Sequence, residues 1–175
     1  MSLHSIRLPH HKSSAEAQTA KPILPPKVVI SMSQHGGVPC TPLVQVGDEV
    51  KTGQLIGSSD AVISAPVHAS ISGKVTEITD VINIAGTRNT AVVIEASNKQ
   101  ELHESVKPPE LTDRASFIEA LKRSGSVGLG GAGFTTYVKM NYDPNTSSVD
   151  TLLINAAECE TYITSDYRAI IESAD

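Results

Sequence analysis

The sequence predicts an α+β protein in which an all-β module precedes an α/β segment. Between residues 27 and 96, short runs rich in Val and Ile alternate with Gly, Pro and Asp, as in strands joined by tight turns. From residue 112 onward, the pattern changes to a helix, a glycine-rich loop, an apolar strand and a second helix. A length of 175 residues suits one small domain together with part of another.

The composition narrows the possible functions. Hydrophobic residues make up 39% and charged residues 19%, which is typical of a globular protein and not of a disordered one. A net charge of -5, without a dense Lys/Arg cluster, argues against nucleic acid as a partner. No run approaches the roughly 20 apolar residues of a transmembrane helix, so we expect no direct membrane span.

The two cysteines, Cys40 and Cys159, lie far apart in the sequence and form no paired motif. We therefore expect both to be reduced, in a cytoplasmic protein. A disulfide between them is the less favoured alternative.

Residues 1–26 are expected to form an irregular arm. This arm contains three histidines, His4, His10 and His11. They could ligate a metal, but no second ligand cluster follows at a fixed spacing, so a solvated tail is favoured. The arm also lacks the continuous apolar core of a secretory signal.

Residues 97–111, "SNKQELHESVKPPEL", are polar and end in a pair of prolines followed by two residues. Such a stretch is typical of a linker between domains. The sequence thus predicts an arm (1–26), a β module (27–96), this linker, and a partial α/β domain (112–175).

The β module contains two similar turn motifs. "VGDEVKTGQLIG" carries Gly-Asp-x-Val at Gly47, Asp48 and Val50, and "APVHASISGKVTEI" carries Ala65-Pro66 with a later Gly and Val. Both resemble the biotinyl/lipoyl family, which implies a barrel-sandwich hybrid fold.

In such carrier domains a modified lysine stands at the hairpin tip between the two halves. The corresponding residues 58–64 read "SSDAVIS" and contain no lysine. Because covalent attachment needs an amine, a biotin or lipoate carrier is disfavoured. A structural or docking module is expected instead.

Local signals define the helices of the second segment. Thr112 or Asp113 can cap a helix that Gly125 closes in a left-handed conformation. Residues 149–155, "VDTLLIN", predict a buried strand. Residues 164–175 predict a second helix, capped by Ser165 or Asp166, with Ile170 and Ile171 facing inward.

Between the first helix and this strand lies a loop that is unusually rich in glycine. Gly128, Gly130 and Gly133 fit G-x-G-x-x-G, but only "SV" separates the helix from the loop, so a conventional Rossmann turn is disfavoured. The missing Cβ atoms at these positions and at Gly131 would let a flat ring or a phosphate approach main-chain N–H groups. A flexible linker is less favoured, because an ordered apolar segment follows at once.

The predicted strand is followed by three polar residues, Asn155, Glu158 and Glu160. At the carboxyl end of a strand, acids can accept hydrogen bonds from ribose hydroxyls or ring N–H groups. Two carboxylates without a nearby His make a poor zinc site, so we assign no metal ligands. Cys159 is expected to be a buried structural cysteine and not a redox thiol.

Taken together, "GLGGAGFTTYVKM" and "LLINAAECETYITSDYR" resemble the RnfC family. These proteins are subunits of the membrane-associated, ion-translocating Rnf electron-transport complex, with a central domain similar to the flavin- and NADH-binding subunit of respiratory complex I. "SQHGGVPCTPLVQVGDEVKTGQLIG" and "SAPVHASISGKV" are similar to the family's N-terminal β module.

The resemblance implies cofactor-binding roles but no catalytic side chain. The glycines of the loop would cradle FMN, and Phe134 would lie near the nicotinamide face. Lys139 would balance flavin or phosphate charge, Asn155 and Glu158 would touch the flavin edge, and Glu160 would accept from NADH. The implied chemistry is hydride transfer from NADH to flavin and electron passage to iron–sulfur clusters.

The sequence departs from the family pattern in three ways. Thr135 and Thr161 replace prolines, which would have preset φ at both turns. Two isolated cysteines cannot hold a [4Fe–4S] cluster, so the clusters are expected only in a missing downstream portion. We therefore expect a truncated fragment that is inactive alone.

The resemblance also implies a location and partners. We expect a protein peripheral to the inner face of the cell membrane, with NADH and other subunits of the complex as partners. The alternative is a non-catalytic docking module in which the glycine loop is vestigial.

Overall fold

The structure, a computed structural model, describes residues 8–83, 86–129, 132–143, 145–146 and 148–173. His4, Gly130 and Gly131, which carry sequence-based predictions, lie outside the described residues. The chain divides into two compact units, each described by itself below. One is Leu24–Ser148, and the other combines Met1–Ile23 with Val149–Asp175.

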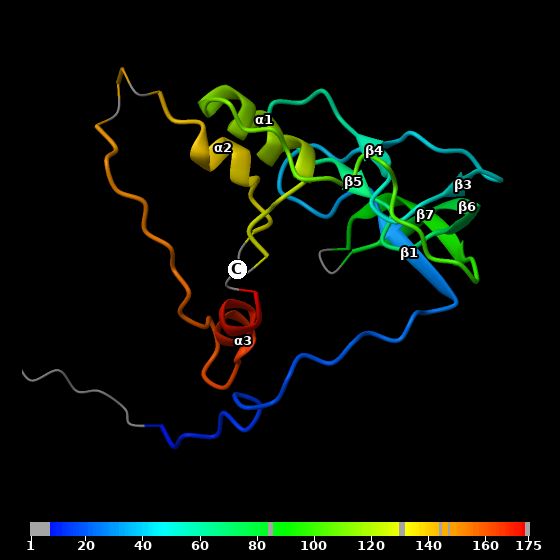
Figure 1. Cartoon of the computed structure of the whole chain (residues 1–175). Coiled ribbons are helices and arrows are strands. Elements are labelled where there is room, and N and C mark those ends of the chain that lie inside the picture. Colours follow the sequence, from blue (N-terminus) through cyan, green and yellow to red (C-terminus); the bar gives the residue numbers. More distant parts are fainter. Residues whose placement is uncertain (1–7, 84–85, 130–131, 144, 147, 174–175) are drawn as a thin grey trace, which may run out of the picture. The chain divides into compact units, whose positions relative to one another are not determined.

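The first unit contains the predicted β module (Figure 1). Within its described residues, the larger sheet has four antiparallel strands in the order β1-β7-β6-β3. Their bounds are β1 Lys27–Ser31, β7 Arg88–Ala96, β6 Gly73–Ile82 and β3 Glu49–Val50. β7 lies between β1 and β6, and its continuous apolar run from Ala91 to Ile94 is buried. Val92 and Ile94 of this run belong to the hydrophobic core.

The smaller sheet has three strands in the order β2-β4-β5. Their bounds are β2 Thr41–Pro42, β4 Leu55–Ser58 and β5 Val67–His68. The core of the module is aliphatic, as the near absence of aromatic residues requires. Its completely buried members include Met32, Ile56, Val75, Val92 and Ile94.

The hairpin tip between β4 and β5 is fastened to the loop that follows β1. The N–H of Val38 donates to the carbonyl of Ile63 over 3.0 Å, and the Ser64 hydroxyl donates to the carbonyl of Val38 over 2.9 Å. His35 Nε2 lies 3.0 Å from Ser64 Oγ. These contacts hold the lysine-free tip against the module.

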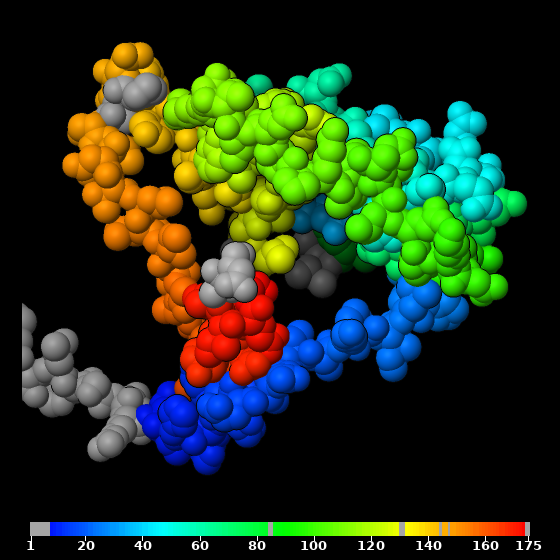
Figure 2. Space-filling view, viewed as in Figure 1, coloured from blue at the N-terminus to red at the C-terminus, as the bar shows by residue number. Residues whose placement is uncertain are grey.

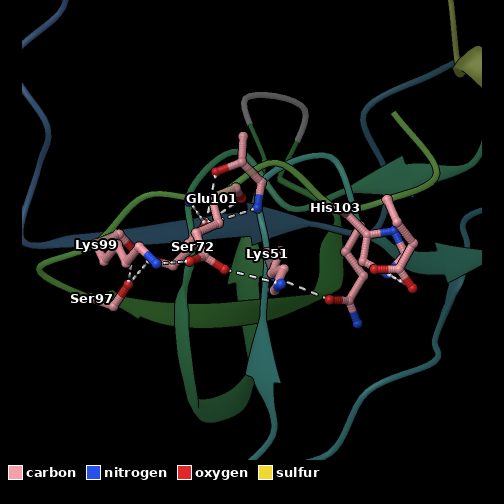
Figure 3. Close-up of polar contacts among 9 residues, drawn as sticks. Lys51, Ser72, Ser97, Lys99, Glu101 and His103 are labelled. Carbon is pink, nitrogen blue, oxygen red and sulfur yellow. Dashed lines mark hydrogen bonds and ion pairs between the residues drawn. The ribbon is translucent and has the colours of Figure 1, made fainter. Parts of the chain in front are cut away.

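The first part of the predicted linker is bound to the β module. The N–H of Thr52 donates to the carbonyl of Glu101 over 3.0 Å, and the N–H of His103 donates to the carbonyl of Thr52 over 2.9 Å. The Ser72 hydroxyl donates to the Glu101 carbonyl and accepts from the Glu101 N–H, at 2.8 and 3.0 Å (Figure 3). Residues 97–103 therefore act as a strap across the module.

Charge also holds this strap. The Glu101 carboxylate pairs with Lys99 and, at 3.0 Å, with Lys51 (Figure 3). Hydrogen bonds from Lys99 and Lys51, together with their positive charges, lower the pKa of Glu101 from 4.5 to about 2. Its carboxylate is exposed, so this pairing contributes little to stability.

Helix α1 (Arg114–Ser124) has the predicted ends. Asp113 caps it in a capping box, its carboxylate accepting from the Ser116 N–H over 2.7 Å. This backbone hydrogen bond lowers the pKa of Asp113. Gly125 closes the helix with φ 71°, the left-handed conformation expected there. The short helix α2 (Thr136–Met140) follows the glycine loop and packs against α1.

The second unit is built around helix α3 (Ser165–Glu172), and here two predictions were wrong. The residue before the helix is Thr164, not Ser165 or Asp166, and its side chain makes no capping bond. Ile170 and Ile171 are 53% and 52% exposed, not inward-facing. No sheet among the described residues of this unit covers that face of the helix.

The predicted strand at residues 149–155 was also wrong. The segment is extended without strand pairing (orange in Figures 1 and 2), and Leu152, Leu153 and Ile154 are 68%, 88% and 82% exposed. A strand exists only when a neighbour takes its backbone hydrogen bonds. The described part of this unit contains no strand with which residues 149–155 could pair.

The N-terminal arm, which has no helix or strand between residues 8 and 26, contacts α3. Ser14 Oγ lies 2.8 Å from the hydroxyl of Thr164, and the N–H of Thr19 donates to the Glu172 carboxylate over 3.0 Å. Arg168 donates to the carbonyl of Ala15 over 3.2 Å and also pairs with Glu172. The arm thus forms the other half of the unit.

Candidate functional site

The glycine loop is a narrow, internally hydrogen-bonded turn. The N–H of Gly128 donates to the Phe134 carbonyl over 3.0 Å, and the N–H of Gly133 donates to the Gly128 carbonyl over 3.2 Å. The N–H of Thr136 donates to the Ser126 carbonyl over 3.0 Å at the base of the turn. In this conformation, the N–H groups of Gly128 and Gly133 hold the loop together and do not point to an outside anion.

One side of this loop combines bare backbone with a positive charge. A Cβ placed on Gly128 would lie 3.4 Å from Lys139 Nζ, so the absent side chain leaves room beside the ammonium group. Lys139 Nζ also lies 5.9 Å from the centre of the Phe134 ring. The structure thus brings together Gly128, Phe134 and Lys139. Among these three, the Lys139 ammonium group is the donor that fits an anionic group such as a flavin phosphate.

Thr135 stands where the family pattern has proline, and it is completely buried. Its hydroxyl has no hydrogen-bond partner among the described residues. An unpaired buried hydroxyl costs about 1–3 kcal/mol. The sequence located this departure, but the burial of the side chain depends on contacts that no local pattern reports.

The acidic segment of the other unit uses its side chains locally. The Glu158 carboxylate accepts the Tyr167 N–H at the start of α3 over 3.0 Å, and this bond lowers its pKa. The Asn155 side chain accepts the Ala157 N–H over 3.0 Å. In this conformation Glu158 caps α3, the role that was predicted for Ser165 or Asp166.

Cys159 and Glu160 form a second local pair. The thiol donates to the Glu160 carboxylate over 3.2 Å, and this acceptor raises the pKa of Cys159. Cys159 is exposed, so the prediction of a buried cysteine was wrong for it, whereas Cys40 is buried. Residues 156–161, Lys12 and Tyr167 surround an open hollow of about 530 Å³.

The predicted site residues therefore form two groups, one in each unit. Gly128, Gly133, Phe134 and Lys139 belong to the first unit, and Asn155, Glu158 and Glu160 belong to the second. Gly130 and Gly131 lie outside the described residues. Within the described ranges, no group of three or more His, Cys, Asp or Glu side chains is placed to hold a metal ion.

Sequence reasoning missed the residues on the β-module side of the loop. The N–H of Gly36 donates to the Gly133 carbonyl over 2.9 Å, and the Tyr137 hydroxyl donates to the Val62 carbonyl. The adjacent pair Gly36-Gly37 in "SQHGG" was the signal that could have indicated a close backbone approach.

Comparison with known proteins identifies the family. The family model described as the RnfC barrel sandwich hybrid domain matches residues 3–99, more than half of the chain. The chain belongs to the RnfC family. A second family model, described as the Nuo51 FMN-binding domain, matches residues 121–175. The predicted fold, a barrel-sandwich hybrid followed by the start of an FMN-binding domain, is thereby confirmed.

Curated relatives carry matching descriptions. The RnfC relative from Clostridium ljungdahlii, from a proton-translocating ferredoxin:NAD(+) oxidoreductase complex, is 42% identical over 99% of this chain and 39% of its own length. The relative from the Na(+)-translocating complex of Acetobacterium woodii is 39% identical, covering 97% and 39%. The relative from the ion-translocating oxidoreductase complex of Pseudomonas aeruginosa is 35% identical, covering 88% and 21%.

The chain thus spans about two fifths, or less, of the length of these RnfC relatives. The relatives are, by description, subunits of multi-subunit ion-translocating oxidoreductase complexes. In the part of this chain that the structure describes, no helix has the length and apolar character needed to cross a membrane.

Proposed function

We propose that this chain supplies the β module and the first part of an FMN/NADH-binding domain to an electron-transfer subunit. The subunit would pass electrons between NADH and iron–sulfur carriers within an ion-translocating complex. The main support for this proposal is that two family models match the same chain. The RnfC barrel-sandwich hybrid model comes first, and the match to the FMN-binding domain begins within α1.

FMN is proposed to lie against the glycine loop. Lys139 would neutralise negative charge on the phosphate or the flavin, and the bare backbone at Gly128 would admit the group beside it. Phe134 would offer an apolar edge, with Gly130, Gly131 and Gly133 completing the cradle. When bound, FMN supplies the chemistry of accepting a hydride and releasing electrons singly.

The acidic segment would complete the site. We propose that Asn155 and Glu158 reach the flavin edge and that Glu160 accepts a hydrogen bond from NADH. Since Glu158 caps α3 in the described conformation, this role would require its carboxylate to exchange one partner for another. The iron–sulfur clusters are proposed to belong to sequence beyond the part matched here.

Other subunits of a membrane-associated complex are the proposed partners. The descriptions of the relatives as members of such complexes support this proposal. We propose a cytoplasmic position, peripheral on the inner face of the membrane.

FMN titration followed by quenching of flavin fluorescence tests the proposal. We expect saturable binding, weakened by Lys139→Ala about tenfold to a hundredfold, the range for losing a hydrogen bond to a charged group. Lys74→Ala, which removes an exposed lysine of β6, is the matched control and should bind like the wild type. Equal binding by both variants would exclude Lys139 from the site.

A second candidate is a non-catalytic docking module. It is favoured by the internal use of the Gly128 and Gly133 N–H groups, which leaves neither free for an anion in this conformation. A folded sample that fails to bind FMN at any accessible concentration would favour this candidate.

A further inference from the structure

The glycine loop lies against the β module at three places, one at its start, one within it and one just after it. At the start, a Cβ on Gly125 would lie 2.6 Å from the Pro66 carbonyl oxygen. Within the loop, a Cβ on Gly133 would lie 3.1 Å from the Cα of His35. After the loop, the Tyr137 hydroxyl donates to the carbonyl of Val62.

Backbone packing is therefore one reason for glycine at two of these positions. Gly125 and Gly133 have φ of 71° and 67°, which other residues rarely adopt. A Cβ on Gly125 would be too close to the Pro66 carbonyl oxygen, and one on Gly133 would be tight against the His35 backbone. On the module side, Gly36 contacts the loop directly, because its N–H donates to the Gly133 carbonyl over 2.9 Å. A Cβ on Gly36 would lie 3.1 Å from the Ala132 carbonyl oxygen.

The module side of this contact is itself rigidly held. His35 Nε2 lies 3.0 Å from both the Val38 carbonyl and the Ser64 hydroxyl, and Ser64 is buried. The contact thus rests on two loops of the module, one after β1 and one between β4 and β5, which these hydrogen bonds join to each other.

We propose that the β module is the positioning element of the glycine loop, with Gly36 and Tyr137 as positioning residues that touch no ligand. The module contacts Gly133 in its left-handed conformation, and this contact sets the path of the loop backbone. The consequence for cofactor affinity rests on the proposed FMN function, whereas the positioning itself does not.

Hydrogen exchange of the full chain without flavin tests the positioning directly. The probes are the amides of Gly128, Gly133 and Thr136, whose hydrogen bonds close the loop, and the reference is the amides of central strand β7. Tyr137→Phe should speed exchange at the probes by about twofold to tenfold, the loss expected for one hydrogen bond, and leave β7 unchanged. Tyr142→Phe is the matched control, because the Tyr142 ring stacks on Arg114 and its removed hydroxyl is not part of that contact.

Gly36→Ala is the second variant. It adds a Cβ that would lie 3.1 Å from the Ala132 carbonyl oxygen, so one of the two must shift by a few tenths of an ångström. Faster exchange at the loop amides, with β7 unchanged, would support the proposal. Unchanged loop exchange in both variants, or an equal rise that includes β7, would overturn it.

FMN titration of the same variants gives a separate result. If the wild type binds FMN, Gly36→Ala should raise the Kd and change the spectrum of bound flavin while β7 protection stays constant. An unchanged Kd and spectrum would overturn the link to the cofactor. If the wild type binds no FMN, the proposed function fails, and the exchange experiment still decides whether the module positions the loop.

Discussion

The β module and residues 149–173 are both rich in aliphatic residues, yet only the module buries them. In the module, Ile56, Val75 and Ile94 are completely inaccessible, whereas Leu153 and Ile154 of the other segment are 88% and 82% exposed. The difference lies in hydrogen-bond partners, because every strand of the module has a neighbour within the described residues of its own unit. An apolar pattern therefore specifies a strand only where the chain also supplies the strand beside it.

The largest expected effect is on the free energy of unfolding, and it compares a buried residue of the module with an exposed residue of the other segment. Ile94→Ala should lower the free energy of unfolding by about 2–5 kcal/mol, because it leaves a cavity in a packed core. Leu153→Ala should change it by less than about 0.5 kcal/mol, as expected for an exposed position. Urea denaturation of both variants checks this, and equal losses would contradict the contrast.

A smaller effect is expected at the buried Thr135, which follows the glycine loop in the first unit. Thr135→Val keeps the shape of the side chain and removes its unpaired hydroxyl, so it should raise the free energy of unfolding by about 1 kcal/mol. Thr41→Val, at an exposed position of β2, is the control and should have little effect. Denaturation curves measure both, and a loss of stability in Thr135→Val would indicate that the hydroxyl has a partner in solution.

The smallest effect concerns pH and compares one exposed carboxylate from each region. The pKa values of Glu101 and Glu172 are both lowered from 4.5 to about 2, by Lys99 with Lys51 and by Thr19 with Arg168 respectively. A lowered folded pKa means that the contribution is complete above about pH 4.5 and is lost as pH falls toward 2. The protection of nearby amides, measured relative to their intrinsic exchange rates at each pH, should fall over this window.

Carboxyl carbon shifts in NMR would report each titration separately. Glu104, whose carboxylate is largely exposed and lies 3.9 Å from His103, is a suitable internal comparison. A Glu101 midpoint near 4.5 would show that the strap's ion pairs do not persist in solution. A Glu172 midpoint near 4.5 would show the same for the contact between the arm and α3.

Local chemistry explains which features were predictable. The cap at Asp113 and the left-handed Gly125 depend on residues within one helical turn. The sequence narrowed the cap to Thr112 or Asp113 and located Gly125. The sequence could not show whether residues 149–155 form a strand, because a strand depends on partner residues elsewhere in a sheet. The inward orientation expected for Ile170 failed for the same reason.

In the candidate site, too, local features were predictable from the sequence and contacts between distant residues were not. Composition alone singled out the glycine loop, and the family resemblance named Lys139. The structure adds that Lys139 lies beside Gly128. The contact between Gly36 and Gly133 joins residues almost a hundred positions apart, and no periodicity signals such a pair. Family resemblance supplied the cofactor, which backbone geometry alone would not have named.

The strap at residues 97–103 has a practical consequence for protein engineering. A β module excised at Ala96 would lose the hydrogen bonds that the Ser72 hydroxyl makes to Glu101 and that the Thr52 carbonyl accepts from His103. Grafting the module onto another protein should therefore carry the sequence through at least His103. The unit to transfer therefore extends beyond β7, its last strand.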